Sequence, residues 1–333
     1  ADDQQRQTLA VGARVSQATP PGALEVTLTL IEDNGGRQIA EPWHLTWDTS
    51  HPVLSATCDM TLDRASLLQV DQPGAAHVRI DLRTADTADG ATAVRRLPGL
   101  TVLPPRRWRL DGGGRWAGAA LATFVQPDQV VVGALAAEAL RLAPPDENAG
   151  PADPAGSASP DALAAAACAV LRRRRVMIKT VSDPWQAGSH PIRTAAGLLD
   201  ARTGSVLDIA VLLAGVLERL GVAATLLLTP TTVLVGYRRR EQDGSAPISP
   251  QEAVDLIQRG VMGMIDPDLA VSASAATLHG LPAPARSAAL AALPDMLLAV
   301  PVDAARAGGA APQPMLERNE DDVVRELDAS DGS

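Results

Sequence analysis

The sequence predicts an α+β protein of two domains, an antiparallel β-sandwich followed by a domain that mixes helices and strands. Two observations lead to this prediction. Short segments with alternating apolar side chains, separated by turn residues, fill the first hundred residues. Longer apolar segments with helical spacing then alternate with short strands, which is typical of α+β folds. A chain of 333 residues with 46% hydrophobic residues is long enough for two domains with sizeable cores.

The β-sandwich is expected over residues 10–105. In residues 22–31 apolar and polar side chains alternate, so that one face is buried and the other is exposed. Residues 33–36 read Asp-Asn-Gly-Gly, which favours a tight turn because Asn and Gly tolerate positive φ. Further strands are expected at 39–47, 52–59, 77–83 and 99–103.

A helical connector and a flexible linker are expected over 106–160, because helical spacing in 116–143 precedes a stretch rich in Pro, Ala, Gly and Ser. The mixed domain follows over 161–305. Its expected helices are 161–174, 193–200, 206–220 and 250–260, its expected strands are 222–228, 232–238 and 261–266, and 284–300 should form a helix and then a strand. Asp161 is expected to cap the first of these helices and Gly221 to end the apolar one.

Residues 306–333 are expected to form an acidic, disordered tail. The stretch 317–333 holds seven acids and two arginines, so its net charge of −5 is half of the formal net charge of −10 of the chain. An acidic chain is poorly suited to general binding of nucleic acid or anionic membranes, because phosphate contact needs local positive charge.

Composition also restricts compartment and cofactors. No apolar stretch has the length of a membrane span, no signal-peptide pattern opens the chain, and Cys58 and Cys168 are far apart, so a reduced cytoplasmic protein with buried thiols is expected. Lys179 is the single lysine, and no P-loop, C-x-x-C or H-E-x-x-H pattern occurs. We therefore expect no metal and no cofactor.

Four short motifs between residues 192 and 237 carry the most information about function. They are Arg193-Thr194, then Gly204-Ser205-Val206-Leu207-Asp208 at the start of the apolar helix, Leu220-Gly221-Val222 at its end, and Thr231-Thr232-Val233-Leu234-Val235-Gly236 in the second strand. In this order and spacing they resemble the core of transglutaminase-like (papain-like) domains. The most similar version occurs in large bacterial proteins that also carry a helicase-like ATPase and often a nuclease-like domain. Residues 116–128 are similar to its pre-domain helix and 262–267 to its acid-bearing strand, so the resemblance covers about 110–305.

The resemblance implies a site for a catalytic cysteine, a histidine and an acid. In that family a cysteine at a helix N-terminus is the nucleophile, a histidine takes its proton, and a carboxylate orients the histidine. Carried over by position, the cysteine becomes Val206, the histidine becomes Thr232, and the acid is retained as Asp266. Valine has no nucleophilic atom and threonine is not a base near neutral pH, so the covalent mechanism is lost.

The implied function is a catalytically inactive interaction or scaffold module. The old cleft would bind a protein segment through Ser205, Asp208, Thr231, Thr232 and Asp266. The family context implies a bacterial conflict or defence system in which a partner chain supplies an ATPase or nuclease.

Two alternatives stay open at this stage. The first is a cryptic hydrolase or transferase in which Ser205 and His190 react, although Ser205 also suits a helix N-cap, Asp208 suits a local hydrogen bond to the preceding loop, and Cys168 suits the core. The second is a nucleic-acid adaptor that contacts phosphates through two clusters, which would need to adjoin in space. The clusters are Arg172, Arg173, Arg174 and Arg175, and Arg238, Arg239 and Arg240.

Overall fold

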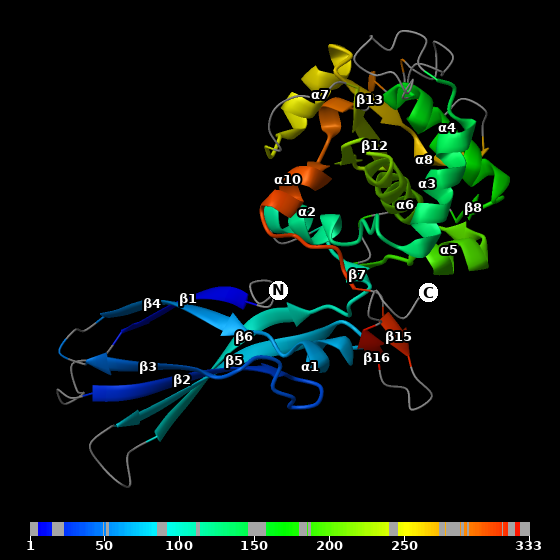
Figure 1. Cartoon of the computed structure of the whole chain (residues 1–333). Helices are drawn as coiled ribbons and strands as arrows, with labels where there is room; N and C mark the ends of the chain where they lie inside the picture. The colour runs from blue at the N-terminus through cyan, green and yellow to red at the C-terminus, as the bar shows by residue number, and fades with distance from the viewer. Residues whose placement is uncertain are drawn as a thin grey trace. The chain divides into compact units, whose positions relative to one another are not determined.

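Figure 1 shows a computed structural model of the chain. It describes residues 6–14, 23–48, 50, 53–84, 92–110, 114–145, 158–179, 185, 188–239, 246–272, 277, 287, 290–291, 293–314, 316–318 and 324–326. The chain divides into two compact units. The first unit comprises 1–106 and 316–325, and the second unit comprises 107–315 and 326–333. The α+β class is confirmed, since helices and mainly antiparallel strands both build the protein.

The first unit is built mainly from antiparallel strands. Its strands are β1 (Arg6–Arg14), β2 (Ala23–Glu32), β3 (Trp43–Asp48), β4 (Val53–Thr61), β5 (Gly74–Thr84) and β6 (Thr92–Val102), with helix α1 (Arg64–Leu68) between β4 and β5. One sheet has the order β3-β2-β5-β6, and β1 pairs with β4 in a second ladder. The alternation predicted for 22–31 is confirmed, because Val26, Leu28 and Leu30 are buried in one cluster. Met60 of β4 belongs to the same cluster, so this strand helps to cover the sheet.

The second unit alternates helices with short strands. Its helices are α2 (Gly114–Ala122), α3 (Val130–Leu142), α4 (Pro160–Arg173), α5 (Ala195–Ala201), α6 (Val206–Arg219), α7 (Pro250–Gln258), α8 (Pro267–Ser272), the 3-10 turn η2 (Leu293–Asp295) and α10 (Val302–Ala307). Its strands are β7 (Arg107–Trp108), β8 (Met177–Ile178), β9 (His190–Pro191), β10 (Thr203–Gly204), β11 (Ala224–Leu228), β12 (Val233–Arg238), β13 (Met262–Ile265) and β14 (Leu298–Pro301).

Two strands near the C-terminus, β15 (Leu316–Arg318) and β16 (Val324–Glu326), pair with each other.

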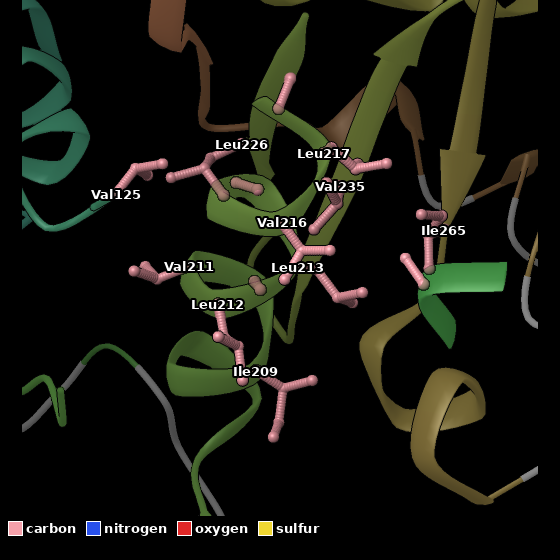
Figure 2. Packing of buried hydrophobic residues seen from close by; sticks show 14 of the residues in the cluster. Val125, Ile209, Val211, Leu212, Leu213, Val216, Leu217, Leu226, Val235 and Ile265 are labelled. Carbon is pink, nitrogen blue, oxygen red and sulfur yellow. The ribbon is translucent and has the colours of Figure 1, made fainter. Parts of the chain in front are cut away.

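Helix α6 is the centre of the second unit. All of its residues from Leu207 to Leu217 are buried, so the helix is enclosed on every side rather than on one stripe. Figure 2 shows Val125 on one side of α6 and Leu226, Val235 and Ile265 toward its other sides. Helices α3 and α4 pack against α6 as well (Figure 1). A sequence with so few aromatic residues therefore builds its core from aliphatic side chains.

The sheet β13-β12-β11-β14 lies between two apolar layers. Alternate residues of a strand point to opposite faces. Leu226 and Val235 face the cluster around α6, whereas Leu227 and Leu234 face the cluster that contains Val254 of α7. Because both faces are covered, every residue of β11 is buried, which explains why all of its residues except Thr225 are apolar.

The structure differs from the sequence prediction in three places. Ser159, rather than Asp161, caps α4 by accepting the N–H of Ala162 at 3.3 Å. Asp161 instead accepts a hydrogen bond from the hydroxyl of buried Tyr237 at 2.7 Å. The pKa of that hydroxyl is raised mainly by its burial and also by the nearby Asp161 carboxylate.

Second, the expected helical connector belongs to the core of the second unit, since its residues Leu121 and Leu135 are buried there. Residues 146–157 of the expected linker lie outside the described residues. Third, β15 and β16 occur where a disordered tail is expected. None of the helices in the described part of the chain has the length and apolarity to span a bilayer.

The enclosed position of α6 makes a stability prediction. Leu213 has no exposed surface, so Leu213→Ala should lower the free energy of unfolding by about 2–5 kcal/mol through lost burial and a cavity. Urea unfolding measures the change. The matched control is Leu140→Ala on α3, where the side chain is 58% exposed and the expected change is within about 0.5 kcal/mol. Equal effects of the two substitutions would contradict a central α6.

Candidate functional site

A cavity of about 610 Å³ opens at the N-terminal end of α6. We call it the α6 cleft. It is formed within the second unit by the start of α6, the start of β12, the end of β13 and the segments around β8, β9 and β10. The six residues that the resemblance assigns to the old cleft all line this one cavity: Ser205, Val206, Asp208, Thr231, Thr232 and Asp266.

A buried carboxylate fixes the start of α6. Asp208 is 4% exposed and accepts two backbone N–H groups, that of Ser205 at 2.8 Å and that of Arg193 at 2.8 Å. The Ser205 hydroxyl in turn accepts the N–H of Asp208 at 3.1 Å, which completes a capping box. Asp208 therefore makes the local hydrogen bond expected from sequence, and it also ties the Arg193 loop to the helix.

Gly204 lies close to α6 immediately before this cap. A β-carbon on Gly204 would lie 2.3 Å from Leu198 Cδ1 and 3.1 Å from Asp208 Oδ2. At these separations a side chain would force buried Leu198 and Asp208 to shift, so glycine suits the close approach of the loop to α6. The Gly-Ser step of the motif has a structural explanation that does not involve catalysis.

Val206 and Thr232 occupy the positions assigned to the lost cysteine and histidine. Val206 is the first residue of α6 and is partly buried against the core. Thr232 immediately precedes β12, where the Thr229 hydroxyl accepts the N–H of Thr232 at 3.1 Å and stabilises the turn between β11 and β12. Both residues line the α6 cleft, so the strand turn and the helix start are brought together as the motif spacing predicts.

Asp266 follows β13 and already has a structural role. Its carboxylate accepts the N–H of Asp268 at 2.9 Å at the start of α8. Burial raises the pKa of Asp266 above its usual value, while the hydrogen bonds from the backbone of Asp268 and Leu269 act in the opposite direction. Asp266 and Thr232 line the same cleft, so the position assigned to the histidine holds a threonine.

Trp185 and His190 line the cleft, and Trp185 was not assigned to it from sequence. The Trp185 indole N–H donates to the carbonyl of Thr229 at 2.7 Å. The Trp185 ring meets His190 edge to face, with centroids 5.4 Å apart, and meets buried Trp108 in the same way at 6.0 Å. His190 and Ser205 therefore line the same cavity, although Ser205 serves as the helix cap.

Cationic side chains also line the α6 cleft. Lys179 follows β8, and Arg193 precedes α5; both are exposed at the cavity, and neither was assigned to it from sequence. The signal available was weak, because β8 and β10 have two residues each and show no periodicity. Their parallel pairing nevertheless places Lys179 beside Gly204, with the Lys179 N–H donating to the Gly204 carbonyl at 2.7 Å.

Cys168 is not part of the cleft. It lies on α4 with 1% exposure in the apolar cluster around α6. Burial raises the pKa of its thiol to about 12, so the thiolate is not available near neutral pH. In the described part of the chain, no group of three His, Cys, Asp or Glu side chains is arranged to hold a metal ion.

The two arginine clusters lie at opposite ends of α4. Arg239 forms an ion pair with Asp161, near the first turn of α4, and donates to the Gly260 carbonyl at 3.2 Å. Arg173 and Arg174 are at the last turn and the C-cap of the same 14-residue helix, roughly 20 Å away at 1.5 Å per residue. Arg172 donates to the Ala270 carbonyl at 3.5 Å, and Arg240 lies outside the described residues. The clusters do not form the joined patch that a nucleic-acid adaptor would need.

Comparison with known proteins finds no match among protein-family models, curated proteins or solved structures.

The capping arrangement makes a prediction about the cleft. Asp208→Asn replaces one accepting oxygen with an amide donor, so one of the two backbone N–H groups loses its partner in a buried position. The free energy of unfolding should fall by about 2–3 kcal/mol, measured by urea unfolding. Asp200→Asn on the exposed face of α5 is the matched control and should change it by less than about 0.5 kcal/mol. A neutral Asp208→Asn variant would show that the carboxylate does not hold the start of α6.

Proposed function

We propose that the second unit is a catalytically inactive transglutaminase-like (papain-like) domain that binds a peptide segment of a protein partner in the α6 cleft. One observation carries this proposal. The three positions assigned to cysteine, histidine and acid, namely Val206, Thr232 and Asp266, line one cavity although they come from three separate elements.

The chemistry of the cleft favours binding over covalent catalysis. A nucleophile at a helix N-terminus would benefit from the helix dipole and from free N–H groups. Val206 offers only methyl groups there, and the hydroxyl of Thr232 cannot take a proton near neutral pH. Asp266 accepts a backbone N–H at the start of α8, so its role is supported without a histidine partner.

The lining suits an extended peptide. Trp185 and Ile178 provide apolar surface, Lys179 and Arg193 provide positive charge, and Asp268 provides negative charge. A volume of about 610 Å³ is within the range of ligand sites, which combine apolar walls with a few polar groups. A segment of a partner protein with one large apolar side chain beside a charged residue fits this combination.

The biological setting rests on resemblance. The similar bacterial domains accompany helicase-like ATPases and nuclease-like domains, so we place this protein in a cytoplasmic bacterial conflict or defence system with such a partner on another chain. The first unit, with a four-stranded sheet and a covering ladder of β1 and β4, is assigned to a β-sandwich that would present a further protein-binding surface.

A second candidate is a hydrolase in which His190 activates Ser205. The observation in its favour is that both side chains line the α6 cleft. Against it, the Ser205 hydroxyl accepts the N–H of Asp208 as the N-cap of α6. A fluorophosphonate probe distinguishes the two, because an activated Ser205 would be labelled and a capping serine would not.

Peptide selection tests the binding proposal. Peptides enriched from a displayed library on the intact protein should lose at least about tenfold in affinity for Val206→Trp, whose larger ring fills the cleft. Val130→Trp is the matched control, since Val130 is 68% exposed on α3, and it should bind like the wild type. Peptides that bind both variants equally, or that are cleaved or joined to an amine by the wild type, would contradict a non-catalytic α6 cleft.

A further inference from the structure

Arginines surround a second cavity of the second unit, about 480 Å³ in volume, where α4 and α5 end. We call it the arginine pocket. Its lining residues are Arg173, Arg174, Arg175, Arg202 and Leu199. None of the four arginines lines the α6 cleft, so the two cavities have separate cationic groups.

Two of these arginines have an unusual backbone conformation. Arg175 has a φ of 53° and Arg202 a φ of 51°, and among the described residues they are the only non-glycine residues with positive φ. Each follows the last turn of a helix, Arg175 after α4 and Arg202 after α5, where glycine is the usual residue because it has no Cβ. Arginine at both positions costs conformational energy, which indicates that the side chains are used.

A short parallel ladder holds these two positions next to each other. Met177 of β8 pairs with Thr203 of β10, and the Met177 N–H donates to the Arg202 carbonyl at 2.9 Å. Arg202 immediately precedes β10 and Arg175 lies two residues before β8, so both arginines line the pocket near the start of the paired strands. The spacing between the two backbones is set by hydrogen bonds rather than by a mobile loop.

The arginine pocket has an excess of positive charge. Glu138 is paired with Arg174 and lies 3.5 Å from Arg173, and in the described part of the chain no acid pairs with Arg175 or Arg202. The C-terminal ends of α4 and α5 contribute partial negative charges of about half a unit each. The positive charge of four guanidinium groups exceeds the negative charge of Glu138 and of the two helix ends. The chain as a whole has a net charge of −10.

We propose that the arginine pocket binds the phosphate groups of a small ligand with two or three linked phosphates. Guanidinium groups are planar and donate pairs of hydrogen bonds to phosphate oxygens, and several of them converge here within a volume that suits a small ligand. A long nucleic acid is disfavoured, because Arg239 at the far end of α4 is committed to Asp161 and leaves no continuous basic track.

Calorimetry with sodium triphosphate on the full chain tests the proposal. One saturable site is expected, with affinity that falls as salt rises. Arg175→Gly and Arg202→Gly should each weaken binding about tenfold or more, because a bidentate contact is lost. In the absence of ligand both should raise the thermal midpoint, because glycine relieves the positive-φ strain. Binding and stability therefore change in opposite directions.

Three controls make the outcome decisive. Arg259→Gln removes one exposed charge from the C-cap of α7 and should leave the affinity unchanged. Arg175→Lys keeps the charge but not the paired donors, and it should bind more weakly than the wild type. ATP is compared with inorganic triphosphate, and tighter binding of ATP would assign the phosphate chain to a nucleotide.

The proposal is overturned by any of three results. They are no saturable triphosphate binding at low salt, an equal loss in Arg259→Gln, or tighter binding of a single-stranded oligonucleotide than of triphosphate. The last result would assign the arginines to a nucleic-acid surface.

Discussion

The hydrogen bonds of one buried carboxylate determine the arrangement of the candidate site. Asp208 accepts N–H groups from the residue that caps α6 and from Arg193 in a loop that precedes α5. These bonds join the first turn of α6, which is buried from Leu207 to Leu217, to the segment that borders the α6 cleft. Since α6 also supports the sheet through Leu213 and Leu217, the position of the cleft relative to β12 and β13 follows from the packing of one helix.

The elements that could be predicted from sequence are those with a repeated pattern. The apolar segment from 206 to 220 gave helix α6, and alternation in 22–31 gave β2, because each pattern extends over several residues. The strands β8 and β10 have two residues each, so no periodicity marks them. For this reason Lys179 and Trp185, which depend on that region, could not be assigned to the cleft.

Residue type alone also gave incomplete predictions of local roles. Asp161 suits a helix cap by its chemistry, but Ser159 takes the cap and Asp161 bonds to Tyr237 of β12. The partner of Asp161 is 76 residues away in sequence, and local reasoning has no access to it. The N-cap role of Ser205 and the local hydrogen bond of Asp208 are confirmed, because both partners of a capping box lie within one helical turn.

The two cavities are separated by the paired strands β8 and β10. Arg175 and Arg202 precede this ladder and line the arginine pocket, whereas Lys179 and Ser205 follow it and line the α6 cleft. A ligand that orders one end of the ladder would therefore act on backbone that continues into the other cavity.

The central proposal is that Val206 and Thr232, which line one cavity, occupy the positions of a cysteine and a histidine but lack their reactive groups. It is tested by the reactivity of Val206→Cys, alone and combined with Thr232→His, toward iodoacetamide as a function of pH, with mass spectrometry to quantify modification at position 206. The account predicts that the added histidine lowers the pKa of the new thiol, so that the double variant reacts at lower pH than the single variant. Identical pH profiles for the two variants would contradict the account.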